Sequence, residues 1–134
     1  MTYRTVLIVK AAVCLGFGAL MLAAPAALFG VLGARLCGGG TFPAREYAAA
    51  MLGTMLLAWF GKDVKGPDAR GAILLDLLVY DALGVAVTVH ALATNMLNAL
   101  GWGIAAVYLF FTAGSAWVLA REHPFRRTRE HAGV

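Results

Sequence analysis

The chain alternates long apolar stretches with short polar ones. The longest apolar stretch, residues 82–120, covers thirty-nine residues without Asp, Glu, Lys or Arg, and Asn95, Asn98 and Gly101 interrupt it in the middle. An α-helix rises about 1.5 Å per residue, so about twenty residues cross the hydrocarbon of a bilayer. This stretch therefore predicts two membrane-spanning helices joined by a tight turn.

The same pattern predicts two earlier spans. We expect an all-α membrane protein, a four-transmembrane-helix bundle that forms a single domain over residues 1–134, with helices at about 6–24, 45–61, 72–94 and 97–120. Pro25 should end or kink the first helix, because proline lacks an N–H donor and clashes with the preceding turn. Residues 26–36 then form a short helix on the outer surface or an extension of the first helix. Arg45 and Lys62 bound the second span and should reach the two membrane surfaces.

The first segment also fits a second interpretation. Arg4, Lys10 and the apolar run that leads to Ala24-Pro25-Ala26 are typical of a cleavable signal peptide. We expect the segment to be retained as a transmembrane helix.

Composition agrees with a bilayer environment. The 134 residues are 61% hydrophobic and 13% charged, with a mean hydropathy of +0.78, whereas about a quarter of the residues in a soluble domain are charged. The net charge of +4 does not predict a nucleic-acid partner, since the basic residues lie between or beyond the apolar segments. Cys14 and Cys37 should lie at different depths, so we expect no disulfide between them.

Basic residues are distributed unequally between the two sides of the predicted bundle. One side holds nine of them: Arg4, Lys10, Lys62, Lys65, Arg70, Arg121, Arg126, Arg127 and Arg129. The other side holds Arg35 and Arg45. Cytoplasmic loops are enriched in Lys and Arg, so we expect both termini in the cytoplasm and a multi-pass protein of the bacterial inner membrane. The four arginines of the tail, residues 121–134, should contact anionic lipid headgroups.

The third predicted span carries an unusual set of polar residues: Asp76, Tyr80, Asp81, Thr88 and His90. Ionisable groups cost about 2.5 to 3.5 kcal/mol at the centre of a spanning helix on insertion scales, so they normally face protein or water. At 100° per residue they fall on two stripes, one led by Asp76 and Tyr80 and the other by Asp81 and Thr88. Two polar stripes predict two neighbouring helices.

Three of these positions, with Lys10, are candidates for ion pairing or proton transfer. Lys10 and Asp76 lie at similar depths, which predicts an ion pair between them, with Arg70 as the alternative partner of Asp76. Asp81 lies near the predicted midplane, where intramembrane acids serve proton relays. Tyr80 is adjacent to it in the chain. The alternative role for Asp81 is a structural hydrogen bond to a neighbouring helix or subunit.

His90 ends the segment Ala86-Val-Thr-Val-His90. This resembles the Ala-x-x-x-His element of antenna polypeptides, in which a small residue leaves room for a macrocycle above a ligating histidine. The resemblance implies a bacteriochlorophyll ligand, although antenna polypeptides cross the membrane once. Haem is a further candidate cofactor, with a second axial histidine supplied by another chain because His123 and His131 lie in the tail. Otherwise His90 contacts a neighbouring helix.

Nucleotide-binding, metalloprotease and serine-hydrolase motifs are missing from the sequence, and we predict no enzymatic activity. Small residues recur four apart, a spacing that lets membrane helices pack closely. We therefore expect an accessory or scaffolding subunit of an energy-transducing complex, photosynthetic or respiratory, with other membrane subunits or a second copy as partners. A proton-coupled transporter or channel that uses Asp81 and Asp76 is the alternative. The size and the four predicted crossings of this chain resemble those of the small multidrug resistance transporters. Those proteins carry a Glu within helix one, whereas the first helix of this chain has Lys10 and no acid.

Overall fold

The computed structural model describes residues 1–37 and 39–122, and every regular element in these ranges is an α-helix. In chain order the helices are α1 (Tyr3–Ala23), α2 (Pro25–Val31), α3 (Thr41–Gly61), α4 (Pro67–Ala93) and α5 (Gly101–Glu122). Three of them, α1, α4 and α5, are long and apolar enough to cross a membrane, with mean hydropathies of 2.3, 2.0 and 1.7. In the described ranges the protein is thus helical, with three candidate membrane spans.

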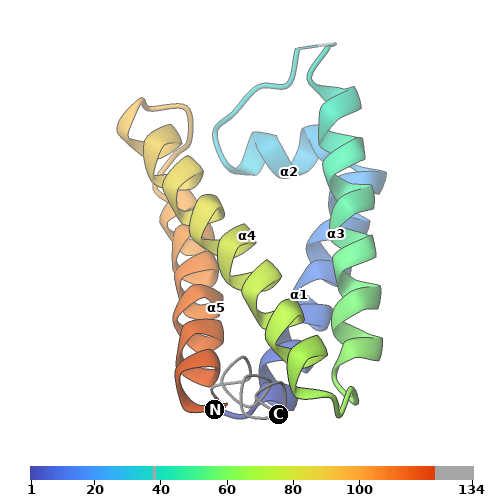
Figure 1. The fold of residues 1–134 in the computed structure, drawn as a ribbon. Coiled ribbons are helices and arrows are strands. Elements are labelled where there is room, and N and C mark those ends of the chain that lie inside the picture. The colour runs from blue at the N-terminus through green and yellow to red at the C-terminus, as the bar shows by residue number, and fades with distance from the viewer. Residues whose placement is uncertain (38, 123–134) are drawn as a thin grey trace, which may run out of the picture.

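The four long helices form two antiparallel pairs, α1 with α3 and α4 with α5 (Figure 1). The pairs meet at the end where α1 begins and α5 ends, which we call the closed end. They separate toward the opposite end, which we call the open end, and there α2 crosses between them (Figure 1). The fold is therefore a wedge whose two halves diverge, in place of a uniformly packed bundle.

Local sequence explains where several helices begin. Thr2 caps α1, because its hydroxyl accepts a hydrogen bond from the Thr5 backbone N–H at 3.3 Å. Pro25 and Pro67 occupy the first turns of α2 and α4, where a missing N–H costs nothing. Pro25 therefore ends α1 and begins a new helix, as the sequence predicts.

Side chains from all four long helices fill the closed end. A buried apolar core joins Leu7 of α1, Ala58 of α3, Leu74 of α4 and Val118 of α5. Polar contacts tie the same region together. The Tyr3 hydroxyl donates to the Gly61 carbonyl at 2.9 Å, and Arg70 pairs with Glu122 at 2.8 Å while its guanidinium lies 4.1 Å from the centre of the Tyr3 ring.

The open end is held by a small apolar cluster around Met21, Ala44 and Ala48 and by the polar contacts of one asparagine. The side-chain amide of Asn98 donates to the Val31 carbonyl and its backbone N–H donates to the Leu32 carbonyl, both at 2.8 Å. Gly33 sits beside Asn98 with φ of +80°, a left-handed conformation that favours glycine. These contacts attach α2 to the turn between α4 and α5.

The structure agrees with the sequence on helix content and on three candidate spans, while a four-span bundle is not established. Helix α3 lies alongside α1 but falls short of the other three in apolar character, and Arg45 and Glu46 occupy its second turn. Helices α1, α3 and α4 begin a few residues earlier than expected, whereas α5 begins later, at Gly101. Both cysteines are free. Arg126, Arg127 and Arg129 lie outside the described residues.

Candidate functional site

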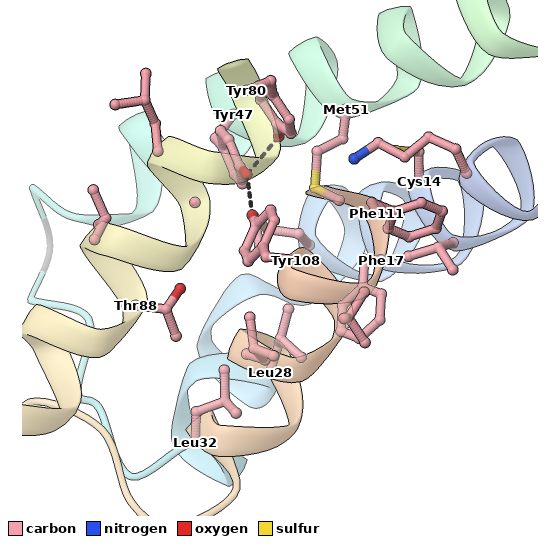
Figure 2. Close-up of a pocket in the computed structure, with 18 of the residues that line it drawn as sticks. Cys14, Phe17, Leu28, Leu32, Tyr47, Met51, Tyr80, Thr88, Tyr108 and Phe111 are labelled. Atoms are coloured by element: carbon pink, nitrogen blue, oxygen red, sulfur yellow. Dashed lines mark hydrogen bonds between the residues drawn. The ribbon is translucent and has the colours of Figure 1, made fainter. Parts of the chain in front are cut away.

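A cavity of about 440 Å³ lies between the two helix pairs on the open-end side of the core. All five helices contribute to its walls (Figure 2). The walls are mostly aliphatic and aromatic, and include Phe17, Leu28, Met51 and Leu97. The polar side chains that join them are Lys10, Tyr47, Tyr80, Thr88 and Tyr108. This combination of an apolar wall and a few polar groups is typical of small-molecule sites, which usually measure about 300 to 1,000 Å³.

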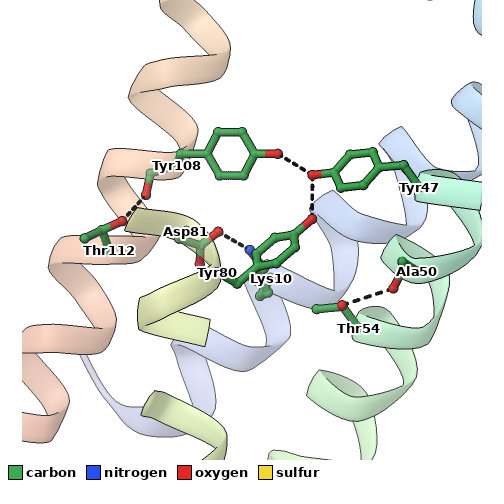
Figure 3. Close-up of polar contacts among 8 residues, drawn as sticks. All are labelled: Lys10, Tyr47, Ala50, Thr54, Tyr80, Asp81, Tyr108 and Thr112. Atoms are coloured by element: carbon green, nitrogen blue, oxygen red, sulfur yellow. Dashed lines mark hydrogen bonds and ion pairs between the residues drawn. The ribbon is translucent and has the colours of Figure 1, made fainter. Parts of the chain in front are cut away.

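Lys10 forms a buried ion pair with Asp81, which joins α1 to α4 beside the cavity (Figure 3). The side chains are only 3% and 0% exposed. The Lys10 ammonium also lies 4.9 Å from the centre of the Tyr80 ring and 4.7 Å from that of Phe111, so aromatic faces surround the charge. The second carboxylate oxygen of Asp81 is buried and has no hydrogen-bond partner among the described residues.

The prediction that Lys10 pairs with Asp76 was wrong. Lys10 pairs with Asp81, one and a half turns further along α4 than the predicted Asp76. Equal depth was the basis of that prediction, but depth does not fix which face of α4 meets α1. Asp76 is exposed on the outer side of α4, and it pairs with neither Lys10 nor Arg70, which pairs with Glu122 instead.

The two predicted polar stripes of α4 have different surroundings. Asp81 and Thr88 are buried, whereas Asp76 and His90 are exposed and Tyr80 lies between these extremes. Asp81 contacts α1 through Lys10, and Tyr80 on the other stripe contacts α3 through Tyr47. Each stripe thus has a side-chain partner on a neighbouring helix, although Asp76 and His90 are exposed.

Three tyrosines from three helices bring their hydroxyls together in the cavity. The Tyr47 hydroxyl of α3 shares hydrogen bonds with Tyr80 of α4 at 2.5 Å and with Tyr108 of α5 at 2.6 Å (Figures 2 and 3). We call Tyr47, Tyr80 and Tyr108 the tyrosine cluster. It bridges the space between the diverging pairs, one turn or less from the ion pair, because Tyr80 immediately precedes Asp81.

Gly84 provides the room that the tyrosine cluster needs. A Cβ atom at this position would lie 2.6 Å from two atoms of the Tyr108 ring, which is closer than packed carbon atoms approach. The glycine therefore lets the Tyr108 ring approach α4 closely, and the Tyr108 hydroxyl is directed at Tyr47 (Figure 3).

Thr88 adds a hydroxyl to the cavity wall on the next turn of α4. Its side chain is only 7% exposed, yet its hydroxyl forms no hydrogen bond with any described residue. Threonine in a helix often donates to the carbonyl four residues earlier, as Thr112 does to Tyr108 at 2.8 Å. Thr88 thus presents an unused donor to the cavity.

The remaining predicted site residues lie away from the cavity. His90 is in the last turn of α4, near the open end, and its ring has no partner among the described residues. His90 is exposed and does not line the cavity, so the antenna-like and haem hypotheses stay predictions. Arg121 lies 4.3 Å above the Trp117 ring at the end of α5, and the rest of the arginine tail is not described.

Sequence reasoning missed the tyrosine cluster. Of its three members, only Tyr80 was among the candidate residues. A usable signal was present: Tyr47, Tyr80 and Tyr108 each lie several residues inside an apolar helix, where a phenol needs a hydrogen-bond partner. Convergence of the three could not be read from spacing, because they lie on three different helices.

No protein-family model, curated protein or solved structure matches this chain. The site must therefore be interpreted from its own chemistry. Among the described residues no group of His, Cys, Asp and Glu could hold a metal ion. The cavity offers apolar surface, hydroxyl donors and a charge-neutral ion pair, which together suit binding of a small molecule.

Proposed function

We propose that this protein binds a small lipophilic molecule within the membrane, in the cavity between its two helix pairs, and that it does so without catalysing a reaction on it. The observation that carries the proposal is the cavity itself. At the closed end side chains fill the space between the pairs, whereas at the open end about 440 Å³ is left beside buried polar groups.

The membrane setting supports this proposal. Many large apolar side chains point outward from the helices, including Leu15, Leu20, Leu109, Phe110 and Trp117, as expected of a surface in contact with lipid. A lipophilic molecule already concentrated in the bilayer would reach the cavity between the diverging pairs without crossing water.

The proposed placement is a bacterial inner membrane with four crossings and both termini in the cytoplasm. The nine-to-two distribution of basic residues supports it, as does the close antiparallel packing of α3 on α1. Reporter fusions after Met1 and after Val134 should both be active only with cytoplasmic reporters. A periplasmic signal from either fusion would contradict this topology.

The binding proposal can be tested by filling the cavity. Val87 lines it but is largely exposed, so Val87→Trp should occupy the space with little disturbance of packed atoms. Val79→Trp is the matched control, on the exposed surface of the same helix and outside the cavity wall. Each protein is purified from its native membranes, and co-purifying organic molecules are extracted and identified by mass spectrometry.

We expect one lipophilic compound in near-stoichiometric amount with the wild type and with Val79→Trp, and a loss of at least about tenfold with Val87→Trp. Equal amounts in all three preparations would show that the compound is bulk lipid on the outer surface. That result would contradict binding in the cavity.

A second candidate function, an accessory subunit of a membrane complex, is favoured by Asp76. This carboxylate is exposed on the outer side of α4, and it forms no hydrogen bond or ion pair with any described residue. Ionisable groups at such depths normally face protein or water, so a neighbouring subunit would supply the partner. Isolation of the untagged protein in mild detergent should then yield stoichiometric partner polypeptides that Asp76→Leu removes and Val79→Leu retains. A particle that contains only this chain would contradict this role.

The transporter alternative also remains testable. It requires Asp81 to exchange a proton, and the structure instead engages Asp81 with Lys10 and leaves Asp76 on the opposite face of α4. If Asp81 relays protons, Asp81→Asn should abolish proton flux into proteoliposomes. Unchanged flux in that variant would reject the relay.

A further inference from the structure

We propose that the cavity selects a neutral, largely apolar molecule that carries one or more hydrogen-bond-accepting oxygens, of which a ketone or quinone carbonyl is the simplest. This inference rests on the proposed function and adds the chemical class of the ligand. Three properties of the cavity support it: its charge, the number of its hydroxyl protons and the distribution of its apolar walls.

The charge of the cavity favours a neutral ligand. Lys10 is the one charged side chain among the described residues that line it, and the Asp81 carboxylate already neutralises that charge. A cationic ligand would meet the ammonium. An anionic ligand would leave one negative charge uncompensated in a low-dielectric site, which is costly. A neutral molecule preserves the ion pair.

The tyrosine cluster has one more proton than its internal hydrogen bonds use. Three phenol hydroxyls carry three protons, and the cluster contains two hydrogen bonds, Tyr47–Tyr80 and Tyr47–Tyr108. Whichever way these two bonds run, they leave one O–H that is free to donate to a further acceptor. A ligand oxygen can accept it, and an unused donor in an apolar site carries a desolvation cost.

Thr88 supplies a second, independent donor on the same wall. Its hydroxyl is unpartnered among the described residues and its side chain is more than nine-tenths buried. It follows Gly84 by one turn, and the Tyr108 ring packs on Gly84. The donors therefore lie along one side of the cavity, where a carbonyl compound could accept from both regions.

The rest of the cavity suits an apolar body. Between Lys10 and Met21 it extends along about 16 Å of α1. Toward the open end its walls are Met21, Leu28, Phe29, Leu32 and Leu97, which offer no polar side-chain group other than a thioether. A ligand would place its oxygen near the hydroxyls and its hydrocarbon portion beneath α2.

Benzophenone is a direct probe of this inference, because it is a neutral lipophilic ketone that attaches covalently to nearby C–H bonds on illumination. Full-length protein in detergent micelles is labelled with benzophenone, and adducts are located by peptide mass spectrometry. We expect adducts on cavity residues, with Met21 and Met51 as prominent sites, and their loss in Val87→Trp.

The class of ligand is then tested by competition with matched molecules. Fluorenone and fluorene share a ring system and differ in the carbonyl oxygen, and concentrations are expressed as mole fractions in the micelle. One hydrogen bond in a buried site corresponds to a preference of about three- to tenfold. We expect fluorenone to suppress the cavity adducts at a concentration about tenfold lower than fluorene.

Variants identify the donors. Thr88→Val keeps the shape of the side chain and removes its hydroxyl, so the preference for fluorenone should fall about threefold. Replacing Tyr47, Tyr80 and Tyr108 together by Phe should reduce it by a similar or larger factor. Any single Tyr→Phe change should have little effect on the preference, because the two hydroxyls that remain still hold at least one spare proton. Val85→Ala, outside the cavity wall, is the control.

The outcomes separate this inference from the proposed function. Cavity adducts that fluorene and fluorenone suppress equally would overturn the acceptor class and leave cavity binding intact. A preference unchanged by both Thr88→Val and the triple Phe variant would overturn the assigned donors. Stronger competition by fluorene-9-carboxylate would overturn the neutral ligand. Failure to obtain adducts at cavity residues, or adducts that persist in Val87→Trp, would contradict the proposed function itself.

Discussion

The closed and open ends of this molecule are built from the same four helices, but the helices are packed differently at the two ends. At the closed end, large aliphatic side chains such as Leu7, Leu74 and Val118 fill the space between the pairs. At the open end, the pairs diverge and polar groups bridge them: the Lys10–Asp81 ion pair and the tyrosine cluster. The cavity lies beside these polar contacts.

The difference has an energetic basis. In a bilayer, lipid tails are as apolar as leucine side chains, so helix association depends on close packing and on hydrogen bonds. The closed end is held mainly by close packing, and the cavity region is held mainly by hydrogen bonds and the ion pair. Substitutions in the two regions should therefore change stability for different physical reasons.

The largest effect is expected from breaking the ion pair. Lys10→Met or Asp81→Leu leaves one buried charge without its partner, which should lower the free energy of unfolding by about 3 to 5 kcal/mol. The double variant removes both charges and should recover most of that loss. SDS titration of the purified protein in mixed micelles, followed by circular dichroism, measures each value. A double variant as unstable as the worse single variant would show that the ion pair does not stabilise through charge compensation.

Leucine truncations compare the two ends directly. Leu74 is fully buried at the closed end, and Leu74→Ala should cost about 2 to 3 kcal/mol through the void it leaves. Leu83 lines the cavity and is 62% exposed, so Leu83→Ala should cost less than about 1 kcal/mol because few packed atoms lose contacts. The same titration measures both variants. Equal losses would mean that the cavity is packed as tightly as the core.

Gly84→Ala should disturb the tyrosine cluster selectively. The new methyl group would displace the Tyr108 ring and break its contact with Tyr47, at a cost of about 1 to 3 kcal/mol. Gly103→Ala is the matched control on α5, since no atom lies within 4 Å of a Cβ there, and it should be neutral or slightly stabilising. Near-ultraviolet circular dichroism reports the tyrosine environment. An unchanged spectrum in Gly84→Ala would contradict this packing.

The smallest effect is expected at the rim of the open end. Asn98→Ala removes the side-chain hydrogen bond to the Val31 carbonyl, worth about 1 kcal/mol or less at an exposed site. Global stability should hardly change, but amide hydrogen exchange in α2 should accelerate, because this bond is one of those that attach α2 to the turn between α4 and α5. Exchange in α3 serves as the internal reference. Equal acceleration in both helices would point to general destabilisation instead.

Features set by local interactions along the chain could be predicted from the sequence, and features set by contacts between distant segments could not. Helix content, the two halves of residues 82–120 and the break at Pro25 are set by local patterns of apolar and breaking residues, and these predictions agree with the structure. Spacing also showed that α4 carries two polar stripes. It did not show that the stripe of Asp81 and Thr88 faces protein while Asp76 and His90 face outward.

The sequence by itself determined the helical character of the protein and its apolar stretches long enough to span a membrane, because burial of the backbone in hydrocarbon requires such helices. The tertiary structure alone decided which residues meet. The rotation of each helix about its axis selected Asp81 over Asp76 as the partner of Lys10. The angle between the helix pairs brought Tyr47, Tyr80 and Tyr108 together and left a cavity beside them. Rotations and angles of this kind arise from contacts between distant segments, and no local pattern encodes them.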